Sequence, residues 1–247
     1  MSRGFTADDV SAQTGRTFLV TGANAGIGFE TTKILAARGA HVILACRDAD
    51  RAEAAINRIR VDVPKAELSF QPLDLADLDQ VRDAAKAVLA GPRIDVLINN
   101  AGVMIPPKTL TKQGFELQFG VNHLGTFAFT GLVHPHVEDR IVITGSIAHK
   151  NGAMDYSDLG ASRGYHNWAP YQMSKLADLL HMFARCPRIC VSDCKRPWVP
   201  RIRSNRSSAA AGWRVCSPPP RPVSDGASPS RCSIPKWQPP CRRTASS

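Results

Sequence analysis

Cysteine is nearly missing from the first three quarters of this 247-residue chain, since only Cys46 of the seven precedes residue 186. This scarcity excludes a disulfide scaffold there and is typical of a reduced, intracellular protein. Long apolar runs are missing too, because none approaches the roughly 20 residues that a membrane span needs. The polar residues 1–15, which include Asp8 and Asp9, are not typical of a secretory signal. We therefore expect a cytoplasmic protein without a membrane span.

Acidic residues are scarce only at the end of the chain. Residues 186–247 hold 12 Lys and Arg but 2 Asp and Glu, and residues 1–185 hold 19 of each sign, so the last quarter carries the whole net charge of +10. Such a charge on a folded domain would favour nucleic acid or a membrane surface as a partner. Because residues 1–185 are neutral, a nucleic-acid partner is not expected for them.

Short apolar runs alternate with amphipathic helical patterns along residues 16–184. The apolar runs predict strands at 16–20, 41–45, 67–73, 94–98 and 140–144. The helical patterns predict helices at 27–38, 49–60, 77–89, 114–132 and 171–184. In the first helix Ile27, Ile34 and Leu35 share one face. Strands that alternate with helices predict an α/β fold with a doubly wound, Rossmann-like parallel sheet.

A glycine-rich turn, Thr21–Gly28, follows the first predicted strand and opens the first helix. Glycines in that context allow a tight turn and a close approach of the backbone to a pyrophosphate. The free N–H groups of the helix then face the phosphates. Other tight turns between a strand and a helix also use glycine, so the turn alone leaves nucleotide binding open. Its candidate cofactor-binding residues are Gly22, Asn24, Gly26, Ile27 and Gly28.

Two polar positions after later strands are candidates for the adenosine end of a cofactor. Arg47 follows the second predicted strand, where an acidic residue would bind a ribose 2′-hydroxyl and an Arg accommodates a 2′-phosphate. Arg47 thus favours NADP over NAD, although a surface Arg beside Asp48 is the alternative. Asp74 and Leu75 follow the third strand, where the carboxylate could accept from an adenine amino group. The alternative role of Asp74 is a helix cap.

Asn99-Asn100-Ala101-Gly102 ends the fourth predicted strand. Paired asparagines at a strand end can hydrogen-bond neighbouring loops and fix the sheet edge, although a simple turn uses the same residues. Asn99, Ala101 and Gly102 are therefore further candidates for cofactor binding.

Tyr171 and Lys175 lie four residues apart in the last predicted helix, which places the phenol and the ammonium on one face. The pKa of an isolated tyrosine is about 10, too high for proton transfer at neutral pH. A nearby cation favours the phenolate and so lowers this pKa. Isolated Tyr-x-x-x-Lys pairs are common on protein surfaces. Neither Tyr156 nor Tyr165 has such a partner, which singles out Tyr171.

Taken in this order, the motifs of residues 14–184 resemble the short-chain dehydrogenase/reductase family. Besides the segments above, Val121-Asn122-His123 is similar to the segment that holds the family's catalytic asparagine. Ile143-Thr144-Gly145-Ser146 is similar to the strand end with its catalytic serine. Ala45-Cys46-Arg47-Asp48 looks most like the retinol-dehydrogenase-like branch, which generally prefers NADP(H).

The resemblance implies an oxidoreductase that transfers a hydride between NADP(H) and an apolar aldehyde, ketone or alcohol. Tyr171 would transfer the proton to or from the carbonyl oxygen, and Lys175 would favour its ionisation and hold the nicotinamide ribose. Ser146 would hydrogen-bond the substrate oxygen, and Asn122 would hold a water that links Lys175 to solvent. Capping a loop is the alternative role of Ser146, and satisfying a helix backbone is that of Asn122. The family also implies a possible homo-oligomer.

The resemblance stops near Arg185, so we expect residues 1–185 to form a catalytic domain that lacks its last strands and lid. Residues 186–247 are rich in Arg, Pro, Ser and Cys and are typical of a segment that does not fold by itself. A frameshift is the favoured explanation; a natural basic tail and a zinc site are the others. Because the tail cysteines lack the close pairs that structural zinc favours, no metal site is predicted.

An early end to the domain would have two consequences. The fifth strand would become an exposed sheet edge, which invites aggregation, and the nicotinamide pocket would lack one wall. Two alternatives to the enzyme follow: a non-catalytic NADP(H)-binding relic, and a nucleic-acid-binding protein that acts through its basic tail.

Overall fold

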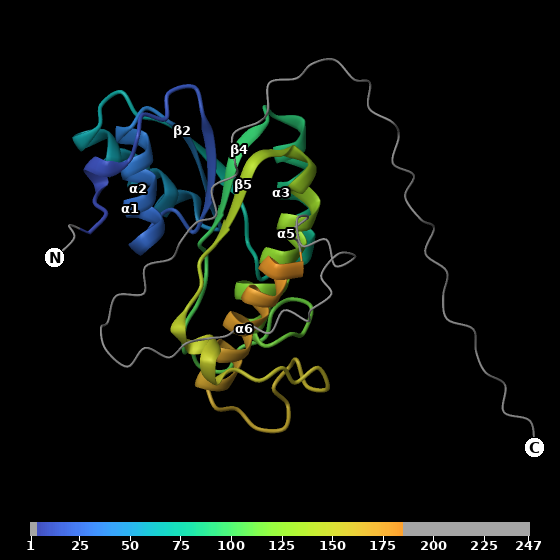
Figure 1. Ribbon diagram of the computed structural model, residues 1–247. Helices are drawn as coiled ribbons and strands as arrows, with labels where there is room; N and C mark the ends of the chain where they lie inside the picture. The colour runs from blue at the N-terminus through green and yellow to red at the C-terminus, as the bar shows by residue number, and fades with distance from the viewer. Residues whose placement is uncertain (1–3, 185–247) are drawn as a thin grey trace, which may run out of the picture. The chain divides into compact units, whose positions relative to one another are not determined.

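The computed structural model describes residues 4–184, which form a parallel five-stranded sheet with helices on both faces (Figure 1). The strands have the order β3-β2-β1-β4-β5 in the sheet. Their bounds are Thr17–Thr21 for β1, His41–Cys46 for β2, Glu67–Pro72 for β3, Ile94–Asn99 for β4 and Val137–Ile143 for β5. This confirms the predicted doubly wound α/β fold, with strand ends shifted by at most three residues. The predicted tail, residues 186–247, lies outside the described residues.

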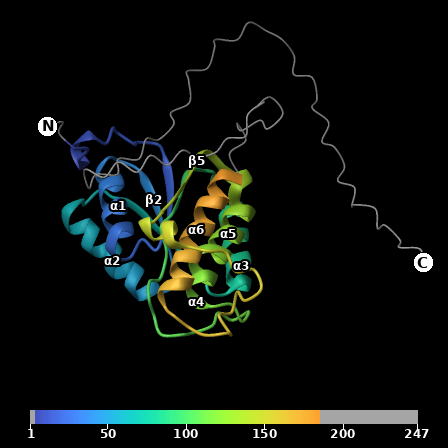
Figure 2. The same ribbon diagram turned by 60° about the horizontal axis from the view of Figure 1, so that its bottom comes forward.

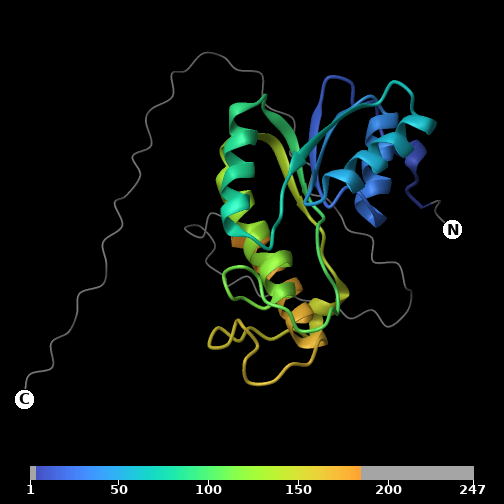
Figure 3. The same cartoon turned by 180° about the vertical axis from the view of Figure 1, so that it is seen from behind.

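Helices α1, Gly26–Ala37, and α2, Ala49–Asp62, cover one face of the sheet. Helix α3, Leu78–Ala90, and helix α5, Thr126–Val133, cover the other face, and α6, Trp168–Ala184, lies beside them (Figures 2 and 3). Side chains of a strand point to alternate faces, so Phe18 and Val20 pack under α1 while Leu19 packs under α3.

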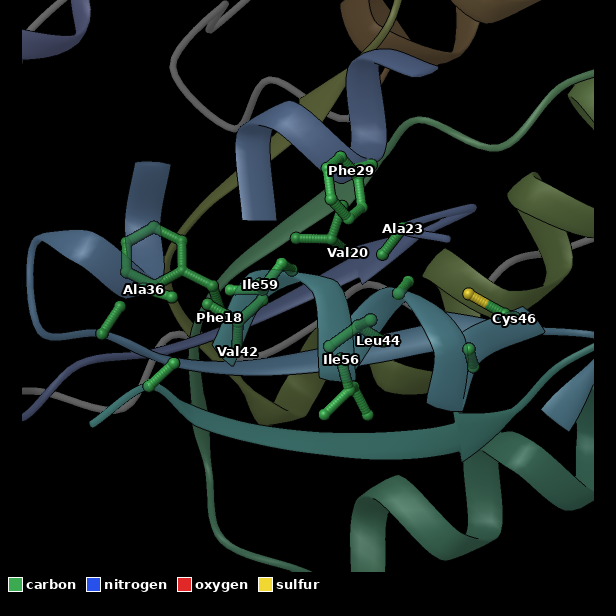
Figure 4. Close-up of a cluster of buried hydrophobic side chains, with 14 of the residues drawn as sticks. Phe18, Val20, Ala23, Phe29, Ala36, Val42, Leu44, Cys46, Ile56 and Ile59 are labelled. Carbon is green, nitrogen blue, oxygen red and sulfur yellow. The ribbon is translucent and has the colours of Figure 1, made fainter. Parts of the chain in front are cut away.

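The core beneath α1 and α2 is shown in Figure 4, where Phe29 of α1 and Ile56 and Ile59 of α2 lie over the strands. In α1, Ile27 is 71% exposed, while Gly28, Phe29, Thr32 and Ala36 are buried. Ile27 lines the cavity described below.

The predicted helix at 114–132 begins at Leu117, because the carboxylate of Glu116 caps it by accepting from the N–H of Phe119 at 2.9 Å. The helical run has three parts: α4, Leu117–Phe119; a π-helical segment η2, Gly120–Gly125; and α5. Short π-helical insertions are rare and occur often at functional sites. This one contains Asn122.

Within residues 4–184 strand β5 lies at the edge of the sheet, and four of its seven residues are exposed. Arg16 links the first half of β5 to β4, since it pairs with Asp139 of β5 at 2.5 Å and with Asp95 of β4 at 3.7 Å. Burial alone would raise the pKa of Asp139, but hydrogen bonds from Arg140 and Arg16 outweigh it and lower that pKa. No helix among residues 4–184 is both long and apolar enough to span a bilayer.

Candidate active site

A cavity of about 520 Å³ opens at the carboxyl ends of the strands. The chain passes from β1 to β2 on one side of β1 and later places β4 on its other side, so the cavity lies where the strand order reverses. In open α/β sheets this crevice is the usual ligand site. The predicted site residues that line it are Gly22, Asn24, Ile27, Arg47, Asp74, Leu75, Ala101, Gly102, Ser146, Tyr171 and Lys175.

The predicted residues that do not line this cavity are Gly26, Gly28, Asn99 and Asn122. Gly28 has a packing role, because a Cβ there would meet the carbonyl oxygen of Gly22 and lie 2.5 Å from Nδ2 of Asn100. Gly22 has a φ of 64°, in the left-handed region, and a Cβ on it would lie 2.9 Å from Cα of Ala101. The turn is therefore built for close backbone contact.

The first N–H groups of α1 are open to a ligand. Ala25 is the N-cap of this helix and supplies no side-chain hydrogen bond, so the helix N-terminus keeps its partial positive charge and its free donors. Asn24, Ala25 and Ile27 all line the cavity there. This arrangement fits the pyrophosphate of a dinucleotide.

The Asn-Asn-Ala-Gly segment joins the ends of β1 and β4. Oγ1 of Thr21 accepts from the backbone N–H groups of Asn100 and Ala101, both at 3.0 Å. In return Nδ2 of Asn100 donates to the carbonyl oxygens of Thr21 at 3.0 Å and Gly22 at 3.3 Å. Asn99 points the other way, is buried, and donates to Thr130 at 2.9 Å. The segment thus fixes the neighbouring loop, as its sequence suggested.

The cavity also carries two arginines, Arg47 and Arg51. Arg47 is exposed, and Arg51 pairs with Asp48 at 3.3 Å. Asp48 is the N-cap of α2, because its Oδ1 accepts from the N–H of Arg51 at 3.0 Å. Its carboxylate therefore faces Arg51, and the three side chains together carry one net positive charge. Beside them burial raises the pKa of the Cys46 thiol.

Asp74 lines the cavity, and its Oδ1 accepts from the N–H of Ala76 at 2.9 Å. The cap of α3 is Asp77 instead, which accepts from the N–H of Asp79 at 2.9 Å. The helix-cap alternative for Asp74 is therefore wrong.

The four predicted catalytic residues come from three segments. Tyr171 and Lys175 are on α6, Ser146 follows β5, and Asn122 lies in η2. Ser146 also caps a short helix, because its Oγ accepts from the N–H of Ala148 at 3.2 Å. This bond uses a lone pair and leaves the hydroxyl proton for another acceptor.

Asn122 is buried behind the cavity wall, and its side chain is fully engaged. Oδ1 accepts from the N–H of Val103 at 2.7 Å, and Nδ2 donates to the carbonyl oxygen of Val103 at 2.9 Å and to Ser174 at 3.1 Å. The amide therefore holds the backbone after β4, and the water that the resemblance assigns to Asn122 stays a prediction.

Lys175 is buried, and its Nζ donates to the carbonyl oxygen of Thr144 and to Oδ2 of Asp178, both at 3.0 Å. The first bond ties α6 to the end of β5. The ammonium lies one helical turn from Tyr171, as the spacing predicted.

The sequence model of the short chain dehydrogenase family matches residues 16–185. This chain belongs to that family. Human retinol dehydrogenase 13 is 46% identical over 172 residues, which cover 67% of this chain and 52% of that protein. Human retinol dehydrogenase 12 is 37% identical over 232 residues, which cover 89% of this chain and 73% of that protein. The chain thus spans about half the length of some of the curated relatives it matches.

Solved structures of dehydrogenase folds agree with this assignment. An uncharacterized protein from Mycobacterium paratuberculosis is 45% identical with a TM-score of 0.67, and the match covers 72% of this chain and 64% of that one. A short chain dehydrogenase from Escherichia coli CFT073, complexed with NADPH, is 26% identical with a TM-score of 0.52, over 66% of this chain and 67% of that one.

Sequence reasoning missed some residues that the dehydrogenase site brings together. Arg51 and Met104 line the cavity, and Asp178 pairs with Lys175 from the interior of α6. The spacing Lys-x-x-Asp was a readable signal for Asp178, since such residues are neighbours on a helix. Among residues 4–184 no group of three or more His, Cys, Asp and Glu is arranged to hold a metal ion.

Proposed function

We propose that this dehydrogenase transfers a hydride between NADP(H) and the carbonyl or alcohol carbon of an apolar substrate. The observation that carries the proposal is the meeting of Ser146, Tyr171 and Lys175 with the glycine-rich turn in one cavity. When bound, the nicotinamide would supply or accept the hydride. The residues of the chain would bind, orient and exchange the proton.

The choice of NADP(H) rests on charge. The open N-terminus of α1 suits the pyrophosphate, and Arg47 and Arg51 offer two cations where a 2′-phosphate would lie. Asp48 would accept from a 2′-hydroxyl if it were free, but it is engaged with Arg51. The NADPH complex of the relative from Escherichia coli supports the same cofactor for this chain.

The proton would move at Tyr171. In reduction its phenol would give the proton to the carbonyl oxygen while the carbonyl carbon takes the hydride, and in oxidation both steps would reverse. The ammonium of Lys175 would stabilise the phenolate, and the Ser146 hydroxyl would donate to the same substrate oxygen. Asn122 would act indirectly, because its side chain hydrogen-bonds the backbone of Val103 in the cavity wall.

An apolar substrate is supported by the side chains of the cavity. Val103, Met104, Leu117 and Val121 line it near Tyr171, and Met104 is 61% exposed. Trp168 lies with its ring 6.1 Å from that of Tyr171 in an edge-on arrangement. The names of the retinol dehydrogenase relatives make retinal and other long apolar aldehydes the first compounds to assay.

The test is turnover of NADPH with an apolar aldehyde by the purified chain and by Tyr171→Phe. General acid–base catalysis contributes about 10²- to 10⁴-fold, so Tyr171→Phe should lower kcat by that factor and still bind NADPH. Tyr156→Phe, in an exposed loop, is the matched control and should keep its rate. NADPH binding without turnover by the unmodified chain would favour the non-catalytic relic, and equal rates for both tyrosine variants would refute the role of Tyr171.

Two further properties are proposed, a homo-oligomer and a cytoplasmic location. The homo-oligomer rests on the family resemblance, and helices α5 and α6 would form its interface. Light scattering at several concentrations would test it. The cytoplasmic location remains a prediction from composition, which fractionation of cells would check.

A further inference from the structure

Ile105, on the segment after β4, has a φ of 56°. This is the left-handed region, where a β-branched residue is a true outlier. Such a conformation is strained and persists only where neighbours hold it. Ile105 follows Met104, which lines the cavity and is 61% exposed.

Gln118 holds the amide of Ile105. The N–H of Ile105 donates to Oε1 of Gln118 at 2.8 Å, and the Gln118 side chain is fully buried. Nε2 of Gln118 donates to the carbonyl oxygen of Asn167 at 2.8 Å. The buried amide therefore links the segment after β4 to the residue that precedes α6.

Tyr165 and Glu116 complete the contacts. The hydroxyl of Tyr165 donates to the carbonyl oxygen of Pro106 at 3.0 Å, and it lies 3.3 Å from Oε1 of Glu116 and from Nε2 of Gln118. Burial, with the carboxylate of Glu116 close by, raises the pKa of Tyr165, so the hydroxyl keeps the proton that it donates. Glu116 is itself fully buried and caps α4.

Met104 is consequently held on both sides from one helical run. Asn122 binds both backbone groups of Val103, and Gln118, four residues earlier, binds the N–H of Ile105. The side chain of Met104, exposed to the cavity, has a fixed backbone and a strained neighbour. A wall made in this way keeps its position before any substrate arrives.

We infer that Gln118, with Glu116 and Tyr165, is a positioning cluster that fixes Met104 in the cavity wall and so sets the width of the substrate end. The inference rests on the proposed function, because it assigns Met104 to the substrate side. Gln118 touches neither substrate nor cofactor. Its effect on the reaction acts through Ile105 and Met104.

The experiment compares Gln118→Met with Gln13→Met. Both remove a buried glutamine amide, but Gln13 bonds to Ser11 and Arg16 before β1, far along the chain from the cavity wall. Hydrogen exchange of the peptide that contains residues 103–108 is measured by mass spectrometry. Gln118→Met should speed exchange there by about tenfold or more, while Gln13→Met leaves it unchanged. Unchanged exchange in Gln118→Met, or an equal rise throughout the chain, would overturn the inference.

Kinetics with an apolar aldehyde give the second readout. Gln118→Met should raise KM about tenfold and change kcat and NADPH affinity less than threefold, because only the substrate wall moves. In combination with Ile105→Gly the rise in KM should be smaller, since glycine is not driven out of the left-handed region. Equal rises in both backgrounds would overturn the role of strain. If the unmodified chain shows no turnover, the proposed function fails, and the exchange result still decides whether the cluster holds Met104.

Discussion

The ammonium of Lys175 lies 3.0 Å from Oδ2 of Asp178, and both side chains are buried on α6. The other carboxylate oxygen of Asp178 lies 3.3 Å from Nδ1 of His123 in η2. The cation at the proposed catalytic centre thus has a buried counter-charge within its own helix. This counter-charge lets a buried lysine line the cavity without the full cost of burying an unpaired charge.

The first prediction concerns that pair. Asp178→Leu leaves the ammonium of Lys175 buried without its carboxylate, so the free energy of unfolding should fall by about 3–5 kcal/mol. The double variant Lys175→Met with Asp178→Leu should lose less, because neither charge then remains. Urea unfolding measures both.

The control for this prediction is the pair Lys86 and Asp83 on α3, which has the same spacing of three but lies at the surface. Asp83→Leu should change the free energy of unfolding by no more than about 0.5 kcal/mol. A double variant as unstable as Asp178→Leu alone would show that packing, rather than charge, decides the cost at Asp178.

The second prediction concerns cofactor choice. Replacing Arg47 and Arg51 by alanine removes two cations from the adenosine end of the cavity. Hydrogen bonds to charged groups are worth about 1.5–3 kcal/mol, so NADPH should bind roughly tenfold or more weakly. Fluorescence titration measures the change. NADH, which lacks the 2′-phosphate, is the internal control, and an equal loss for both cofactors would contradict the assignment.

Local patterns predicted most of the fold. The apolar runs located all five strands of the sheet. The strand order depends on contacts between segments far apart in the chain, and no local pattern encodes it. The π-helical segment at Gly120–Gly125 was not predictable, because no local residue pattern separates it from an ordinary helix.

The motifs placed most of the site in one cavity, yet they did not show which residues touch it. Gly28 was a cofactor candidate from spacing alone, and its role depends on a contact with Gly22 and Asn100 that only the folded turn creates. Asn122 was a candidate by resemblance, and its partner Val103 lies 19 positions earlier. Long-range contacts of this kind carry no signal in a single sequence.

The third prediction concerns Gly28. Because a Cβ at this position would run into the carbonyl oxygen of Gly22, Gly28→Ala must displace backbone of the cofactor turn. Overpacking of this kind typically costs about 1–3 kcal/mol, and NADPH binding should weaken with it. Gly91→Ala is the control, since a Cβ there meets its nearest atom at 3.5 Å, an ordinary contact. Similar thermal midpoints for the two variants would contradict the tight packing inferred for the turn.

The fourth prediction concerns pH and Asp77, the N-cap of α3. A hydrogen bond from Lys112 at 2.9 Å, helped by those from Asp79 and Gln113, holds the pKa of Asp77 well below its usual range. The pKa of Asp in an unfolded chain is about 3.9. The ionised carboxylate therefore stabilises the fold fully above that pH, and the stabilisation is lost as the pH falls toward the lowered pKa of the folded state.

Asp77→Asn isolates this charge, because Asn is an equally good N-cap. The variant should be less stable than the unmodified chain at pH 7, and the gap between their urea midpoints should narrow as the pH falls below about 4. Asp83→Asn, exposed on the same helix, should show little gap at either pH. A gap for Asp77→Asn that stays constant down to acid pH would mean that the charge of Asp77 adds nothing, and that its side chain acts on α3 as a cap alone.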